Sequence, residues 1–341
     1  MRYNLQFGSY FTGGGGVIEQ ALKECAAPID FRFGVENNPK IAEVYRQNHG
    51  DHILTADVRD VAPSDLPTVD WFHASPVCCR FSPKNHANRD DESDDHREND
   101  TDYTTAQATA KFIREKKPRF VTVENVREYI GTRSYDVIAS ELNRSGYAFD
   151  VKVYEDYLIG GFTLRKRMIL RATTEIGAIF PKPKRDTSKV GKWIDFVEGC
   201  FEDHVSVLTE VRSKKAMNSI NIPPRDIFRY EVEKDCIIDY MGNPNMCLHF
   251  GKIGKPMFTL CSSDSKTIGW HKGEEKYNEY HAMTSPRFFY RCHGIDNYKC
   301  DDIGLGGFIC GNGIPRSFVE NVMLPFVLQK GSGELSQGLL L

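Results

Sequence analysis

Two adjacent cysteines, Cys78 and Cys79, follow the largely apolar stretch TVDWFHASPV. A free thiol in such a place is an inert small hydrophobic side chain, a metal ligand, or a nucleophile activated by its surroundings. Adjacent cysteines do not readily form a disulfide with each other, because that bond needs a wider separation of the two Cα atoms. The pair therefore predicts either one reactive thiolate beside a packing residue or two packing residues.

The rest of the chain argues against a metal site or a membrane protein. Its 10 cysteines are scattered, with no C-x-x-C pair and no Cys/His cluster at zinc spacing, so we expect no metal. No apolar run approaches the roughly 20 residues of a membrane span, and the N-terminus lacks the features of a signal peptide. We therefore expect a soluble, cytoplasmic protein.

The charge of the chain is unevenly distributed around a net value of -3. Residues 89–102 (RDDESDDHRENDTD) are strongly acidic, whereas residues 182–192 and 212–215 are basic. Runs of this kind are most often solvated loops. The bulk charge therefore neither requires nor excludes a nucleic-acid partner.

The elements that would position the cysteines alternate between strand and helix. The sequence YNLQFGSYF is followed by a glycine run, Gly13 to Gly16, and then by the amphipathic pattern VIEQALKEC. Further strand patterns are FRFGVE, HILTADVRDV, VDWFHAS and RFVTVEN, with helix patterns at 38–50 and 104–117. Such alternation predicts a doubly wound α/β sheet.

Polar residues stand where these strands end. They include Glu36, Asp57 and the pair Glu124–Asn125. In doubly wound sheets, ligands bind at the carboxyl ends of the strands, and an acid that ends the second strand can accept ribose hydroxyls. The glycine run departs from G-x-G-x-x-G, which disfavours a nicotinamide cofactor.

The second half of the chain is less regular. Residues 176–194 read as a proline-punctuated linker, and residues 195–280 hold short strand-like pieces at 226–233, 236–241, 246–251 and 257–263. Helical patterns return at 285–294 and 314–329. We expect one domain formed by residues 1–175 and 283–341, and a small irregular domain formed by residues 195–280.

A set of short motifs follows a fixed order along the chain. Together they resemble the DNA (cytosine-5) methyltransferase family over residues 1 to about 172 and about 283–328. The unmatched middle corresponds to that family's variable target-recognition region. The motifs are Phe11-x-Gly13-x-Gly15-Gly16, Glu36, Asp57, Pro76-Val77-Cys78-Cys79-x-Phe81-Ser82, Glu124-Asn125-Val126, Arg165-x-Arg167 and Gly311-Asn312.

The resemblance implies an α/β fold with a doubly wound, mostly parallel sheet of the S-adenosylmethionine-dependent methyltransferase type. A smaller, irregular target-recognition domain would accompany it. The implied cofactor is S-adenosylmethionine, with Glu36 holding its ribose and Asp57 meeting its adenine. The residues expected to bind it are Phe11, Gly13, Gly15, Gly16, Glu36, Asn37, Asp57, Val58, Pro76 and Asn312.

The resemblance also implies a reaction and a partner. The chain would methylate C5 of a flipped-out cytosine in duplex DNA through a covalent bond between Cys78 and C6. Glu124, Arg165 and Arg167 would complete the catalytic set. We expect a monomer, prokaryotic or phage-encoded, with a cognate restriction endonuclease system as a further partner. The residues expected to contact DNA are Ser82, Lys214, Lys215 and Arg225.

The chemistry accounts for these residue types without the family. Cytosine C5 becomes nucleophilic only after a nucleophile adds to C6, and a thiolate adds well near neutral pH. A protonated carboxyl at N3, here Glu124, stabilises the charge that develops there, and burial of that residue would help it to hold its proton. A guanidinium can fix O2, and base flipping exposes the reacting edge at a cost of a few kcal/mol.

Departures from the family pattern leave alternatives open. Val77 stands where the family has proline, Cys79 where it has glutamine, and Thr163 where it has the glutamine of Q-x-R-x-R. One alternative is a tRNA cytosine-5 methyltransferase, and another is an inactive nucleic-acid-binding module of the same fold. Taken alone, Glu124–Asn125 could cap a strand and Asp57 could form a turn, whereas the joint order of the motifs favours the functional interpretation.

Overall fold

The computed structural model describes residues 4–12, 15–77, 98–196, 199–201, 236–239, 249–251, 254–260, 268–271, 280–282 and 285–329. The chain divides into two compact units. The first unit comprises Met1–Tyr154, Lys166–Lys184 and Phe318–Leu341, and the second comprises Glu155–Arg165 and Arg185–Ser317. The functional domain boundaries expected near residues 175 and 283 stay a prediction.

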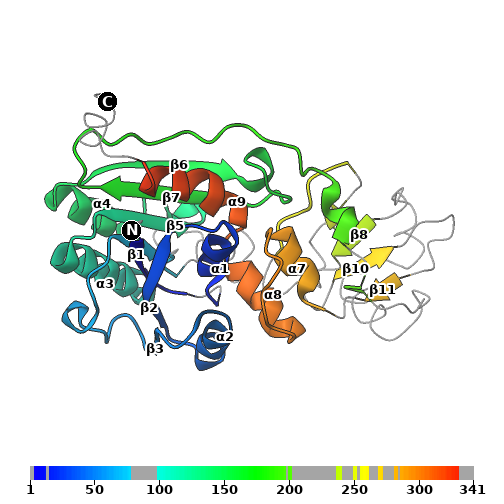
Figure 1. Ribbon diagram of the computed structural model, residues 1–341, viewed down its shortest axis with the longest axis horizontal. Coiled ribbons are helices and arrows are strands. Elements are labelled where there is room, and N and C mark those ends of the chain that lie inside the picture. The colour runs from blue at the N-terminus through cyan, green and yellow to red at the C-terminus, as the bar shows by residue number, and fades with distance from the viewer. Residues whose placement is uncertain are drawn as a thin grey trace, which may run out of the picture. The chain divides into compact units, whose positions relative to one another are not determined.

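The first unit is built on a seven-stranded sheet with the strand order β3-β2-β1-β4-β5-β7-β6 (Figure 1). Strands β3, β2, β1, β4 and β5 run parallel to their neighbours, whereas β7 is antiparallel to β5. The predicted doubly wound, mostly parallel sheet is confirmed. The strands are β1 (Leu5–Tyr10), β2 (Ile29–Glu36), β3 (Ile53–Thr55), β4 (Trp71–Ala74), β5 (Phe120–Asn125), β6 (Ala148–Glu155) and β7 (Lys166–Thr173).

Most of the helices between these strands begin at side-chain caps. In α2 (Pro39–His49), the Asn38 side chain accepts a hydrogen bond from the Lys40 N–H at 3.0 Å. In α3 (Asp100–Lys116), Asn99 and Asp102 form a reciprocal capping box. The acidic run therefore ends inside a helix, where Asp100 and Asp102 lie at the positive end of the helix dipole. Two further helices are α1 (Val17–Glu24) and α4 (Arg133–Arg144).

The two faces of the sheet follow from side-chain alternation along the strands. On one face, Tyr10, Phe72 and Val121 pack with Phe112 of α3 and Leu142 of α4 in the main hydrophobic core. The Phe72 and Phe112 rings are stacked with their centroids 4.2 Å apart. Burial of these aromatic and aliphatic side chains provides the main driving force for folding of this layer.

The opposite face receives α1 and the part of the C-terminal helical run that belongs to the first unit. That run consists of α9 (Arg316–Phe318), a π-helical segment η8 (Val319–Met323) and α10 (Leu324–Val327), of which η8 and α10 belong to the first unit. Segment η8 contacts α1, and the ring of Phe326 packs edge-on against Phe120 of β5 at 5.4 Å.

A buried arginine fastens this C-terminal run to the sheet. Arg171 of β7 is fully buried and bonds to both carboxylate oxygens of Asp150, at 3.0 and 2.7 Å. Its Nη1 donates to the Pro181 carbonyl at 2.7 Å, and the rings of Phe180 and Phe326 each lie 5.7 Å from the guanidinium. Charge, hydrogen bonds and cation–π contacts therefore meet at one side chain.

The second unit contains a four-stranded sheet with the order β11-β10-β8-β9, in which the described neighbours are antiparallel. Strands β8 (Cys236–Asp239) and β9 (His249–Gly251) fall within expected strand-like pieces, whereas β10 (Ile268–His271) and β11 (Tyr280–Ala282) were not expected. The expected piece at 226–233 lies outside the described residues. Helices α7 (Arg287–Cys292) and α8 (Ile303–Asn312) follow, and the sequence did not predict α8.

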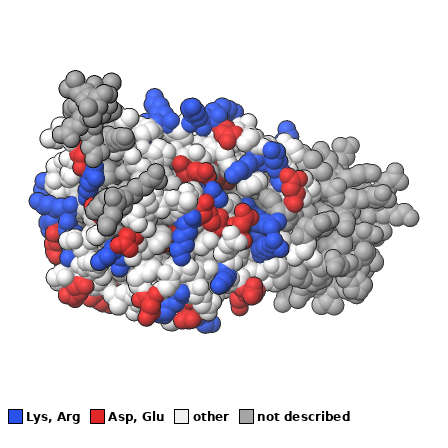
Figure 2. Space-filling view, viewed as in Figure 1, with Lys and Arg blue, Asp and Glu red and all other residues white. Residues whose placement is uncertain are grey.

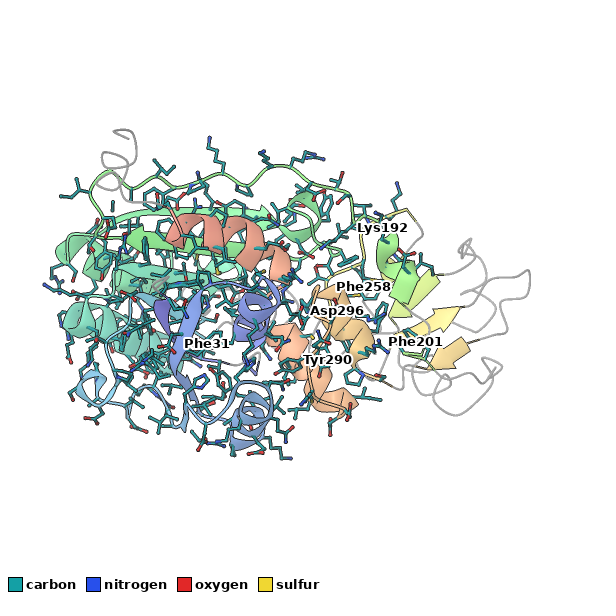
Figure 3. All side chains as sticks on the ribbon, in the orientation of Figure 1. Phe31, Lys192, Phe201, Phe258, Tyr290 and Asp296 are labelled. Carbon is teal, nitrogen blue, oxygen red and sulfur yellow. The ribbon has the colours of Figure 1, made fainter. Side chains whose placement is uncertain are left out.

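Aromatic side chains form part of the interior of the second unit. Phe201, Phe258 and Tyr290, which Figure 3 labels, are all buried. The Phe201 ring packs edge-on against Phe288 of α7 at 5.3 Å. Buried contacts of this kind between distant segments hold a unit with short strands together.

The surface of the described residues carries both charge signs. On the face seen in Figure 2, basic and acidic side chains are interspersed over the described part. Among the described residues, no helix has the length and apolar character needed to cross a membrane.

We predict that Arg171→Met lowers the free energy of unfolding by about 3 kcal/mol, because it leaves the Asp150 carboxylate without its main partner. Urea denaturation measures the change. The matched control is Arg32→Gln, whose ion pair with Asp30 is exposed on both sides, and we expect it to change stability by less than about 1 kcal/mol. Equally small changes in the free energy of unfolding of both variants would contradict this role of Arg171, which we call the Arg171 clamp.

Candidate active site

The carboxyl ends of five parallel strands meet at one edge of the first unit's sheet. These ends lead into the turn after Tyr10, the segments after Glu36 and Thr55, and the loops after Ala74 and Asn125. Since β7 is antiparallel to β5, with Met168 opposite Asn125, its first residues lie at the same edge. This is the edge at which doubly wound folds bind their ligands.

The turn after β1 has an unusual backbone. Phe11 has a φ of 60°, and Gly15 and Gly16 have φ of 55° and 81°. Positive φ is rare for a bulky residue such as phenylalanine and marks a constrained site. A Cβ added to Gly16 would lie 2.4 Å from a ring carbon of His49, so side chains are excluded there. Gly13 lies outside the described residues.

Two carboxylates lie at the carboxyl ends of the next strands: Glu36 is the last residue of β2, and Asp57 lies two residues after β3. Glu36 is buried and accepts the Asn38 N–H at 2.9 Å, and burial raises the pKa of its carboxyl. Asn37 beside it is exposed. Asp57 is held by Arg59 at 2.7 Å, which lowers the Asp57 pKa, and Val58 behind it is buried. A buried acceptor, an exposed amide and an apolar residue suit a ribose and an adenine ring.

An ion pair joins β5 and β7 at this edge. Arg167 Nε lies 2.7 Å from Glu124 Oε1, and the two side chains are only 11% and 5% exposed. Glu124 pairs with Ile169 in the register, so Arg167 is its diagonal neighbour on the same face of the sheet. A buried carboxylate and a guanidinium therefore lie next to each other at the ligand-binding edge.

The next residue, Asn125, holds the loop after β4. Its side-chain amide donates to the Pro76 carbonyl at 3.0 Å, while its Oδ1 accepts the Val126 N–H at 2.8 Å. Both groups of the buried amide are satisfied, so its orientation is fixed. Pro76 precedes Val77 and Cys78 in the sequence. Cys78 itself lies outside the described residues, as do Ser82, Lys214, Lys215 and Arg225.

Arg165 belongs to the second unit and is also buried. It directly precedes β7 and bonds through Nη1 to the Leu260 carbonyl at 3.1 Å. Its Nη2 bonds to the carbonyls of Gly311 and Gly313, at 2.7 and 2.6 Å. Between these glycines, Asn312 ends α8 and donates to the Phe308 carbonyl at 2.9 Å. The geometry favours Arg167 over Arg165 as the arginine that meets a base beside Glu124.

The sequence analysis did not single out His73 of β4. It is 1% exposed and lies 2.8 Å from Thr122 Oγ1 through Nδ1 and 2.9 Å from Ser75 Oγ through Nε2. The only signal in the sequence is a histidine inside a central strand that would otherwise be apolar. The structure thus adds a series of hydrogen-bonded side chains, Thr122–His73–Ser75, which ends two residues before Val77.

The fold and this edge are those of a doubly wound α/β domain that binds its ligand at the carboxyl ends of the strands. The C-5 cytosine-specific DNA methylase family matches residues 5–283, and the chain belongs to this family, whose methyl donor is S-adenosylmethionine. No curated protein matches the chain. The described residues contain no group of three or more His, Cys, Asp or Glu side chains suited to a metal ion.

Several solved structures share the fold. The Entamoeba histolytica methyltransferase EhMeth has a TM-score of 0.67 at 11% identity, covering 96% of this chain and 100% of that one. A Spodoptera frugiperda DNMT2 mutant has a TM-score of 0.69 at 12% identity, covering 96% and 100%. A putative DNA modification methyltransferase encoded in an Escherichia coli prophage has 0.61 at 13% identity, covering 93% and 97%.

We predict that Glu36→Gln weakens binding of S-adenosylmethionine roughly tenfold, because a neutral amide accepts ribose hydrogen bonds less strongly than a carboxylate. Isothermal titration calorimetry measures the dissociation constant. Asp51→Asn is the control, since the Asp51 side chain is 93% exposed. An unchanged constant in Glu36→Gln would remove this residue from the cofactor site.

Proposed function

We propose that the chain methylates C5 of a flipped-out cytosine in duplex DNA through a covalent bond between Cys78 and C6. The observation that carries the proposal is the buried Glu124–Arg167 pair, beside the Asn125 side chain that holds the loop leading to Cys78. We assign the cofactor to the turn at Phe11–Gly16, to Glu36 and Asn37, and to Asp57 and Val58, with Pro76 and Asn312 completing the set.

In the first step, the Cys78 thiolate adds to C6, and the electrons of the C5–C6 double bond move toward N3. Glu124 gives a proton to N3 and becomes a carboxylate. Arg167 stabilises that carboxylate and donates to O2 of the base. The observed ion pair has the charges that this step would produce. When bound, S-adenosylmethionine supplies an electrophilic methyl group for C5.

The second step releases the product. C5 loses its proton to water, Cys78 leaves C6 as a thiolate, and the double bond re-forms. N3 returns its proton to Glu124, so the chain regains its starting state. In this scheme Arg165 binds the backbone carbonyls on either side of Asn312, and its place in the catalytic set stays a prediction.

The choice of duplex DNA follows from the extent of residues 195–280, which correspond to the family's target-recognition region. We place DNA contacts at Ser82, Lys214, Lys215 and Arg225. The alternative acceptor, in place of DNA, is tRNA, because a flipped cytosine in RNA suits the same chemistry and the similar folds include DNMT2 methyltransferases. The expected monomer, cytoplasmic location and cognate restriction endonuclease stay predictions.

We predict transfer of labelled methyl groups from S-adenosylmethionine to duplex DNA and none to tRNA. The assay measures incorporation into each nucleic acid at equal cytosine concentration. Glu124→Gln is the control, because it keeps the hydrogen-bonding shape but cannot give a proton to N3, and we expect at least a hundredfold loss. Transfer to tRNA alone would replace DNA as the substrate, and transfer to neither would support the inactive module.

We also predict that Cys78→Ser abolishes turnover and Cys79→Ser retains most of it. Adjacent side chains of an extended segment point in opposing directions, so one thiol at most faces the base. Trapping on DNA that contains 5-fluorocytosine, followed by peptide mapping, locates the covalent link. An adduct on Cys79, or full activity in Cys78→Ser, would overturn the assignment.

A further inference from the structure

A chain of buried polar side chains crosses from β5 to the end of β4. His73 and Thr122 are directly paired in the register of these strands, and Trp71 lies two residues before His73 on the same face. The Trp71 indole N–H donates to Thr122 Oγ1 at 2.9 Å, and His73 joins that hydroxyl to Ser75. Thr122 and Glu124 also lie on this face of β5, so these hydrogen-bonded side chains lie beside the Glu124–Arg167 ion pair.

The imidazole of His73 is neutral in this setting. Burial lowers the pKa of His73 to about 3, and the described polar neighbours of the ring are hydroxyls rather than carboxylates. A neutral imidazole has one donor and one acceptor nitrogen, so it bonds to both hydroxyls in either tautomer. It is therefore a poor general base but a good rigid bridge.

The His73 imidazole bridges Thr122 and Ser75, and the Ser75 end lies in the segment that leads to Cys78. Ser75 is half-buried, its N–H donates to the Tyr10 carbonyl at 3.4 Å, and Pro76 is held by Asn125. Val77 then connects this fixed segment to Cys78. A valine leaves φ free, whereas a proline at that position would lock it. A buried histidine in a central strand costs free energy unless its hydrogen bonds are made, and here both are made.

We propose that His73 is a positioning residue: acting through Ser75, it restricts the backbone ahead of Cys78 and offsets the freedom of Val77. The inference rests on the proposed function, in which Cys78 is the nucleophile. It differs from an ordinary packing role because it predicts coupling to residue 77. Removal of the His73 hydrogen bonds should lower kcat when residue 77 is valine, and should change kcat little when residue 77 is proline.

The test combines Ser75→Ala and Thr122→Val with Val77→Pro in all pairings. Thr109→Val is the matched control: Thr109 is also a fully buried threonine, but its hydroxyl bonds to the Thr105 carbonyl within α3. We expect Ser75→Ala and Thr122→Val to lower kcat about tenfold with little change in the KM for S-adenosylmethionine. Adding Val77→Pro should restore kcat to within about threefold of the Val77→Pro single variant.

A second readout is independent of turnover. Hydrogen exchange of the Val77 and Cys78 amides should be faster in Ser75→Ala and Thr122→Val than in the wild-type chain, and unchanged in Thr109→Val. Unchanged exchange, or equal loss of kcat with and without Val77→Pro, would overturn the inference. If the wild-type chain lacks methyl transfer while the exchange pattern appears, the proposed function fails and the positioning role stands.

Discussion

The antiparallel register of β5 and β7 is the constraint on which most of the described chemistry depends. It places Arg167 diagonal to Glu124 and puts Arg171 directly opposite Thr122. Both arginines point to the same face because they are four residues apart on one strand. A slip of one residue would turn both to the other face, and the ion pair and the clamp on Asp150 would be lost together.

The same edge combines fixed and adaptable parts. Asn125 and His73 make two hydrogen bonds each inside the protein, so their positions are set before any ligand arrives. Glu124 and Arg167 instead satisfy each other, and a bound base can exchange with either partner. Fixed supports around a replaceable ion pair suit a site that must accept a base from outside.

Local patterns in the sequence predicted the alternating first half of the chain and the acids near the ends of its strands, although β3 ends at Thr55 and not at Asp57 as expected. Those signals depend on apolar runs and helix periodicity, which neighbouring residues determine. The hydrogen bonds of Arg165 could not be predicted in this way. Its partners are backbone carbonyls far along the chain, those of Leu260, Gly311 and Gly313. Helix α8 was missed because its sequence, IGLGGFICGN, is rich in glycine and lacks a polar face.

The contact between α1 and η8 also bears on how the chain is made. The first helix leaves the ribosome long before the segment that covers it, and the Arg171 clamp waits for Val322 and Phe326 as well. Because η8 and α10 are synthesised after all the strands of the sheet, this layer is completed late. During synthesis one face of the nascent sheet therefore stays open to chaperones, and a premature stop upstream of η8 leaves it exposed for good.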